Sequence, residues 1–214
     1  MIRILIVDDH AIVRGGLKEL LSGESGFIVA GEAANGLEAL RRIREQAFDV
    51  VLLDMSMPGR SGVELIKQIK SEHPKLAILV LSMHKEEQYA VRAMKAGALG
   101  YLTKESAPDQ LVAAIRKVAR GGVFITSSAA ERMALELYGN HDATPHTLLS
   151  DREYQVFRMI VAGTPISGIA DKLSLSVKTV STHKTRILQK MGMANAAELI
   201  HYAIRHQLLE PSGD

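Results

Sequence analysis

The chain has 214 residues, of which 47% are hydrophobic and 23% are charged, and its formal net charge is +2. This length favours one or two domains, and the hydrophobic share is sufficient for a packed core. Because the chain contains no cysteine, disulfide bonds, thiolate catalysis and thiolate metal sites are excluded. No apolar run approaches the length of a membrane span, and the N-terminal residues lack a cleavable signal pattern. We therefore expect a cytoplasmic protein that does not bind a membrane.

The first 120 residues alternate short apolar segments with helical patterns. Between and after these segments, apolar residues recur at the spacing of an amphipathic helix. Strands that alternate with helices favour a parallel sheet covered on both faces. We expect residues 2–120 to form a five-stranded, doubly wound α/β domain of the flavodoxin-like kind. The expected strands span 2–7, 27–33, 50–53, 76–82 and 100–102.

A linker is expected over residues 121–145, where this alternation stops. Ser128 and Glu131 have the spacing of a capping box and would begin one helix there. Residues 139–146 are polar and turn-forming, as is typical of a connection between domains.

The last part of the chain, residues 146–211, predicts a domain made only of helices. Ser150 and Glu153 form a second capping box at its start. A short helix, a tight turn and a longer helix from Val177 to about Met191 follow, and a final helix comes after them.

Polar side chains follow the expected strands at their C-terminal ends. Because these ends meet at one edge of a parallel sheet, we expect the side chains to converge. Packed carboxylates repel one another, and Mg²⁺, which prefers oxygen ligands, would hold them together. Asp54 could then act as a nucleophile toward a phosphoryl group, with Ser82 and Lys104 contacting the phosphoryl oxygens. The side chains concerned are Asp8, Asp9, Asp54, Ser82, Thr103 and Lys104.

Each of these residues has a simpler interpretation when it is taken alone. An aspartate at a strand end is more often a helix cap or a turn former. A lysine such as Lys104 is most often a solvated surface side chain. The occurrence of all of them at successive strand ends favours the phosphoryl site.

Four segments resemble the receiver domain of two-component response regulators: LIVDDH (5–10), LLDMSMPGRSG (52–62), LVLSMH (79–84) and GALGYLTKES (97–106). The resemblance extends over residues 2–120 and implies that Asp54 accepts the phosphoryl group. It further implies that Ser82 and Lys104 assist the transfer and that Ser82 and Tyr101 act as switch residues. The Mg²⁺ site would be formed by Asp8, Asp9, Asp54 and the main-chain carbonyl of Ser56.

The helix expected from Val177 to Met191 carries basic and hydroxyl side chains and no acidic one. Its apolar residues, expected to face a core, are Val177, Val180, Ile187 and Met191. A short helix, a tight turn and an exposed basic helix form the helix-turn-helix layout, whose second helix enters the DNA major groove. A merely solvated charged face is the simpler alternative, which the short preceding helix and the absence of acids disfavour.

Residues 149–200 resemble a LuxR-type helix-turn-helix domain of the NarL/FixJ response regulators, with the helix-turn-helix pair at about 166–185. The resemblance implies dimerisation through the final helix, at Leu199, Ile200 and Ala203, and a plain core helix is the simpler alternative for each of these residues taken alone. Departures from the family pattern are Gly168, where an acid is usual, and Ala196, where an arginine is usual. By position, the base-facing side chains are Ser181, Thr182 and Thr185, and the phosphate-facing ones are Lys178, Thr179, Lys184 and Arg186.

Both resemblances together predict a transcription regulator, and not an enzyme. A sensor histidine kinase would phosphorylate Asp54, and the protein would then dimerise and bind half-sites in double-stranded DNA. A phosphohydrolase that uses Asp54 as covalent nucleophile is the alternative, but such enzymes often need an acid where Ser56 stands. A regulator driven by a protein partner or a small ligand, with the pocket unused, is the other alternative.

Overall fold

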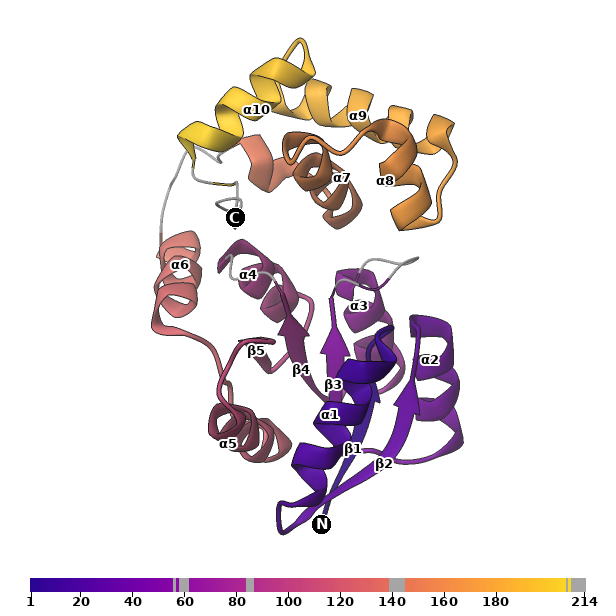
Figure 1. Ribbon diagram of the computed structural model, residues 1–214. Helices are drawn as coiled ribbons and strands as arrows, with labels where there is room; N and C mark the ends of the chain where they lie inside the picture. Colours follow the sequence, from indigo (N-terminus) through magenta and orange to yellow (C-terminus); the bar gives the residue numbers. More distant parts are fainter. Residues whose placement is uncertain (56, 58–61, 84–86, 139–144, 207, 209–214) are drawn as a thin grey trace. The chain divides into compact units, whose positions relative to one another are not determined.

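The computed structural model describes residues 1–55, 57, 62–83, 87–138, 145–206 and 208. The chain divides into two compact units, an N-terminal unit of Met1–Tyr138 and a C-terminal unit of Gly139–Asp214. The first is an α/β unit and the second is helical (Figure 1). Within the described residues, no helix combines the length and the apolar character that crossing a membrane requires.

A parallel sheet with the strand order β2-β1-β3-β4-β5 forms the centre of the N-terminal unit. Every residue of β3 and β4 is buried, as continuous apolar runs require in a sheet covered on both faces. The predicted five-stranded, doubly wound sheet is therefore confirmed. Its strands are β1 (Ile2–Val7), β2 (Phe27–Ala33), β3 (Val50–Asp54), β4 (Ala77–Ser82) and β5 (Gly100–Thr103).

Helices cover both faces of this sheet (Figure 1). One face packs against α1 and α5, with Leu21 and Ile115 among their buried residues. The other face packs against α2, α3 and α4, with Leu40 and Ile66 among their buried residues. The helices are α1 (Ala11–Ser22), α2 (Gly36–Glu45), α3 (Gly62–Glu72), α4 (Glu87–Lys95) and α5 (Pro108–Ala119).

The helical pattern misplaces two apolar residues. Helical spacing groups Ile12 with Leu20 and Leu37 with Leu40, and so predicts that both are buried, yet Ile12 and Leu37 are 90% and 73% exposed. Both lie in the first turn of their helices, α1 and α2, next to the edge where the strands end. The first turn of each helix extends past the edge of the sheet, so an apolar side chain there faces solvent even though it is aligned with buried residues further along the helix.

The segment after α5 returns to the sheet beside β5. Phe124 forms a parallel bridge with Gly100, donates its N–H to the Leu99 carbonyl at 2.8 Å and accepts the Tyr101 N–H at 3.0 Å. The following helix, α6 (Ser127–Tyr138), packs against α4 and belongs to the N-terminal unit. Ala129 of α6 is buried in the same core as Tyr101.

The predicted capping box at the start of α6 is wrong. Because the helix begins at Ser127, Ser128 lies inside it and cannot be its cap. Thr126 takes this role, since its Oγ1 accepts the N–H of Ala129 at 3.3 Å.

The C-terminal unit contains η1 (Pro145–Leu148), α7 (Asp151–Val161), α8 (Ile166–Leu173), α9 (Val177–Met191) and α10 (Ala196–Arg205). The predicted capping box of α7 is confirmed: Ser150 and Glu153 each accept the main-chain N–H of the other. Between α8 and α9, Ser174 adopts a left-handed conformation with φ of 53°, which allows the tight turn. The core of this unit includes Phe157, Ile169, Val180 and Ile187.

Two expectations for this unit need correction. Val177, placed on the core-facing side of α9, is 53% exposed because it occupies the first helical position. On α10, Leu199 and Ala203 are fully buried in the core of the unit, so they are not available to a second chain. Ile204 is a large apolar residue of α10 that faces solvent, at 58% exposure.

Candidate functional site

Two carboxylates meet where β1 and β3 end. The two strands are neighbours, with Val7 beside Leu53, so that Asp8 follows one strand as Asp54 ends the other. Their side chains are only 2% and 0% exposed. Buried carboxylates this close to each other require a positive partner, because unpaired burial of a charge is costly.

Lys104 supplies that partner from the loop after β5. Its Nζ lies 2.6 Å from Asp8 Oδ2 and donates a hydrogen bond of 2.9 Å to Asp54 Oδ2. The main-chain N–H of Lys104 also donates to the Ser82 carbonyl at 2.8 Å, which holds the lysine at this edge. Burial by itself lowers the pKa of Lys104, but the hydrogen bonds and charges of the two aspartates outweigh burial and raise it. The ammonium is therefore fully charged at neutral pH.

Asp9 and His10 complete an acidic cluster that fits a hard cation. Ligand atoms of Asp8, Asp9, His10 and Asp54 all lie within 4.8 Å of one another. Asp9 Oδ1 is buried and has no hydrogen-bond partner among the described residues, which suits an oxygen that ligates a cation. Carboxylate oxygens are the ligands that Mg²⁺ prefers, so the residues present fit this ion. Ser56, whose carbonyl is an expected ligand, lies outside the described residues.

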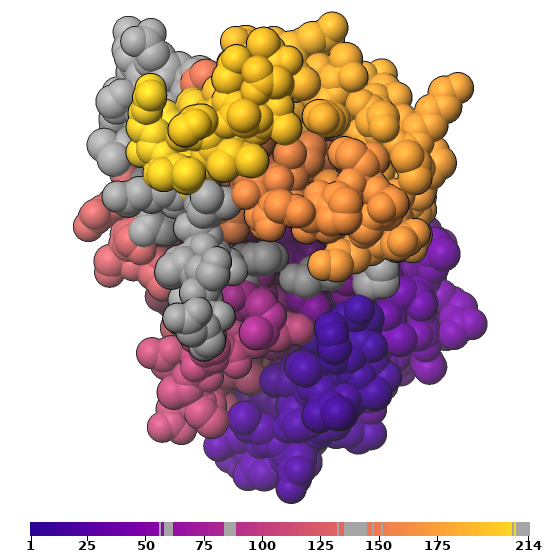
Figure 2. Space-filling view, turned by 45° about the horizontal axis from the view of Figure 1, so that its top comes forward, coloured from indigo at the N-terminus to yellow at the C-terminus, as the bar shows by residue number. Residues whose placement is uncertain are grey.

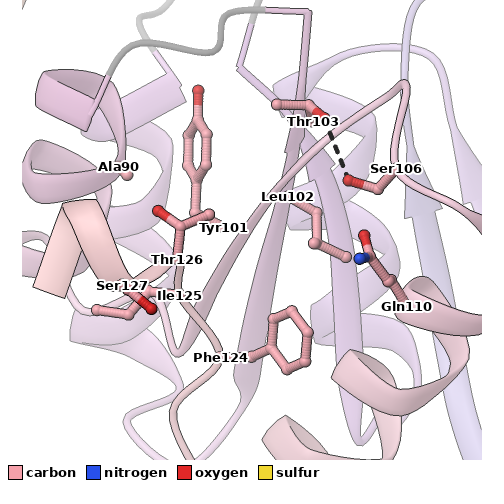
Figure 3. Close-up of a pocket in the computed structure, with 10 residues that line it drawn as sticks. All are labelled: Ala90, Tyr101, Leu102, Thr103, Ser106, Gln110, Phe124, Ile125, Thr126 and Ser127. Atoms are coloured by element: carbon pink, nitrogen blue, oxygen red, sulfur yellow. Dashed lines mark hydrogen bonds between the residues drawn. The ribbon is translucent and has the colours of Figure 1, made fainter.

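Ser82 and Tyr101 lie on the neighbouring strands β4 and β5. Ser82 is fully buried at the end of β4, and Tyr101 is 5% exposed. Tyr101 borders a pocket of about 280 Å³, which α4, β5, the start of α5 and the segment before α6 enclose. Figure 3 shows Tyr101 and Phe124 on this pocket together with the Thr103–Ser106 hydrogen bond of 3.1 Å. Tyr101, one of the two expected switch residues, is thus adjacent to the segment that leads to α6.

The sequence-predicted DNA contacts gather on the solvent side of α9. Thr179 is half-buried, and its Oγ1 lies 2.7 Å from Oγ of the cap residue Ser176. Thr182 and Thr185 donate their hydroxyls to main-chain carbonyls one turn earlier, at 3.0 and 3.1 Å, and keep lone pairs that can accept. Figure 2 shows that α9 and α10 form much of the visible surface of this unit. Lys184 is half-buried, and the exposed members are Lys178, Ser181, Thr182, Thr185 and Arg186.

Lys190, which ends the basic stretch of α9, has a structural partner instead. Its Nζ donates to Glu153 Oε2 at 2.6 Å and so joins α9 to the capping box of α7. Burial alone raises the pKa of Glu153, but hydrogen bonds from Lys190 and Ser150 outweigh burial and lower it. Glu153 is therefore charged at neutral pH.

Sequence reasoning missed two residues beside the acidic cluster. His10 donates its main-chain N–H to Asp8 Oδ1 at 2.8 Å, and its Nδ1 lies 2.9 Å from Asp9 Oδ1. Arg14, one turn later on α1, donates to the Asp8 carbonyl at 2.7 Å. The signal was the four-residue spacing from His10 to Arg14 directly after the acidic pair, which puts both side chains on one side of α1.

Family comparisons match both units. The family described as "Response regulator receiver domain" matches residues 4–116, and "Bacterial regulatory proteins, luxR family" matches residues 147–203. The chain belongs to the two-component response regulators of the NarL/FixJ type, which join a receiver domain to a LuxR-type helix-turn-helix domain.

Individual relatives match over nearly the full length. Response regulator UvrY of Escherichia coli (strain K12) is 41% identical over 209 residues, which are 97% of this chain and 96% of that protein. Response regulator GacA of Pseudomonas viridiflava is 38% identical over 213 residues, which are 99% and 100% of the two chains. A solved structure of RcsB from Salmonella enterica serovar Typhimurium, bound to promoter rprA in the presence of phosphomimetic BeF3-, has a TM-score of 0.65. It shares 29% identity and covers 94% of this chain and 98% of its own.

Proposed function

We propose that this response regulator accepts a phosphoryl group on Asp54 and that phosphorylation controls the binding of α9 to promoter DNA. The observation that carries the proposal is the pair of buried carboxylates, Asp8 and Asp54, that Lys104 bridges at the end of the sheet. Asp54 is the one of the two that ends a strand in the middle of the sheet, as the receiver family requires of its acceptor. A sensor histidine kinase is the donor that this family implies.

The chemistry is a transfer between two oxygen or nitrogen nucleophiles. A carboxylate oxygen of Asp54 attacks phosphorus, the bond from phosphorus to the donor breaks, and the electron pair leaves with the donor. Lys104 is within reach to neutralise a phosphoryl oxygen once the group has bound. Asp8, Asp9 and Asp54, together with the Ser56 carbonyl, would hold Mg²⁺, which supplies the second positive charge for the transfer.

The switch begins with a change in the partners of Lys104. The oxygens of a phosphoryl group on Asp54 would compete with the carboxylate oxygens of Asp54 and Asp8 for the ammonium of Lys104. The hydroxyl of Ser82 on β4 can contact the same phosphoryl group. Tyr101, on the strand next to that of Ser82, donates its main-chain N–H to the carbonyl of Phe124, which precedes α6, so a movement of Tyr101 would reach this segment. We infer that the linker helix α6 carries the change away from the receiver.

DNA binding resides in the helix-turn-helix of α8 and α9. We propose that Ser181, Thr182 and Thr185 contact base edges, and that the neighbouring residues, Lys178, Thr179, Lys184 and Arg186, contact phosphates. RcsB has been solved as dimers on two parallel DNAs, which supports the same arrangement here. The active form would then be a homodimer on paired half-sites, acting in the cytoplasm where its DNA lies.

We propose no enzymatic turnover. A phosphohydrolase that uses Asp54 would need a further acid to activate water, and Asp8 is already paired with Lys104. The position two residues after Asp54 is Ser56, which cannot act as a general acid or base of this kind.

Acetyl phosphate with labelled phosphorus tests the assignment of the acceptor. Wild-type protein with Mg²⁺ should take up about one phosphoryl group per chain, and Asp54→Asn should take up none. Asp49→Asn, which changes an exposed aspartate at the opposite end of β3, is the matched control and should label normally. Stoichiometric labelling of Asp54→Asn would refute the proposal.

A further inference from the structure

We propose that Thr182 and Thr185 contact two adjacent A·T base pairs in each half-site, through adenine amino groups and thymine methyl groups. The inference rests on the proposed binding of α9 to DNA, and it names the bases that this helix prefers. It follows from the hydrogen bonds that the two hydroxyls make within the helix.

Both threonine hydroxyls already use their proton. Thr182 Oγ1 donates to the main-chain carbonyl of Lys178 at 3.0 Å, and Thr185 Oγ1 donates to that of Ser181 at 3.1 Å. A hydroxyl has one proton and two acceptor lone pairs. Each of these exposed side chains therefore offers DNA an acceptor and a methyl group, but no donor.

This combination matches one kind of base pair. In the major groove, guanine presents only acceptors, adenine and cytosine present amino donors, and thymine adds a methyl group. Turning a threonine hydroxyl toward guanine would break its bond to the helix carbonyl, so the exchange would add no hydrogen bond. The A·T pair alone offers both a donor for the hydroxyl oxygen and a methyl group for apolar contact with the threonine methyl.

The spacing of the two threonines sets how many base pairs they contact. They are three residues apart, which places both on the same side of α9. Their separation along the helix axis is about 4.5 Å, and successive base pairs are about 3.4 Å apart. A helix that lies along the major groove therefore brings the two side chains to neighbouring base pairs.

Selection from a random-sequence duplex library by the full chain, with Mg²⁺ and beryllofluoride, tests the preference. We expect enriched half-sites with two adjacent A·T pairs. Thr182→Val keeps the branched shape and removes the acceptor, so the preference for adenine should fall about fivefold at one pair. Thr185→Val should do the same at the neighbouring pair. Thr179→Val is the matched control, because the Thr179 hydroxyl lies 2.7 Å from that of Ser176, and it should leave the enriched sequence unchanged.

Base analogues in the selected duplex identify the contacted groups. Purine in place of adenine removes the amino group and should weaken wild-type binding about fivefold, but it should leave Thr182→Val unaffected at its pair. Replacing adenine by 7-deazaadenine keeps the amino group and removes the N7 acceptor. Because the threonines have no proton to donate to N7, affinity should stay within about twofold. Uracil in place of thymine should weaken wild type and Thr182→Val alike, since valine keeps the methyl contact.

The outcomes separate this inference from the proposed function. Guanine at the positions that respond to the valine variants, or a loss with 7-deazaadenine but not with purine, would overturn the inference and leave DNA binding intact. An enriched sequence that neither valine variant alters would do the same. A wild-type chain that enriches no sequence would contradict the proposed DNA binding itself. Circular dichroism of each variant establishes that it is folded.

Discussion

Lys104 offers the sharpest stability test, because two buried carboxylates depend on it. Replacing it in Lys104→Met keeps the length of the side chain and removes the ammonium that lies 2.6 Å from Asp8 and 2.9 Å from Asp54. The variant is left with two carboxylates that are 2% and 0% exposed and have lost this counter-charge. We expect the N-terminal unit to be strongly destabilised in the absence of divalent cations.

Two estimates bound the loss of unfolding free energy in Lys104→Met. Removing one partner of a buried ion pair costs about 3–5 kcal/mol. Proton uptake sets a ceiling, since protonating an ordinary aspartic acid at pH 7 costs about 4 kcal/mol and relieves the repulsion. We therefore expect a loss of about 3 to 4 kcal/mol in the free energy of unfolding. Mg²⁺ at a hundred times its dissociation constant should return about 2.7 kcal/mol, because it binds only the folded site.

Urea unfolding of the full chain, followed by circular dichroism in EDTA and then in Mg²⁺, measures both quantities. Lys172→Ala on α8 is a control in the other unit and should leave this transition unchanged. The double variant Lys104→Met with Asp54→Asn should recover much of the loss, because only one carboxylate remains. A Lys104→Met protein as stable as wild type in EDTA would refute the electrostatic reasoning.

Further predictions concern the C-terminal unit and DNA. Glu153→Gln should lower the unfolding free energy of that unit by about 2 kcal/mol at pH 7. The lowered pKa of Glu153 means that this contribution is present above about pH 4.5 and is lost as the pH falls through the folded value, which thermal unfolding at pH 7 and pH 3 would detect. Lys184→Ala should weaken DNA binding and reduce the salt dependence by about one counterion, measured by anisotropy at several salt concentrations. Thr182→Ala should instead change the preferred sequence, and unchanged preference would contradict its base contact.

Much of this architecture is predictable because two signals are unambiguous. Continuous apolar runs such as Val50–Leu53 can be buried only in a sheet covered on both faces, and their C-terminal ends must share one edge. The convergence of Asp8, Asp54 and Lys104 follows from that edge alone. The capping box of Ser150 and Glu153 is similarly local, because it needs only four consecutive residues.

Other features depend on contacts that sequence periodicity does not contain. Ile12 and Val177 fit their helical stripes but stand in the first turns of α1 and α9, and the buried residues of both helices lie further along. Lys190 looks like a DNA contact until its ion pair with Glu153, 37 residues away in sequence, is known. The pairing of Phe124 with β5 cannot be read from the sequence, because it is a single bridge and a single bridge requires no run of apolar residues.

The central claim is that phosphorylation of Asp54 controls DNA binding by α9. Titration of the wild-type chain with promoter DNA, with and without Mg²⁺ and beryllofluoride, measures it most directly when Asp54→Asn is titrated in parallel. We predict that beryllofluoride tightens DNA binding of the wild-type protein and leaves Asp54→Asn unchanged. Equal affinities of the wild-type protein in both conditions, or an equal response of Asp54→Asn, would contradict the account.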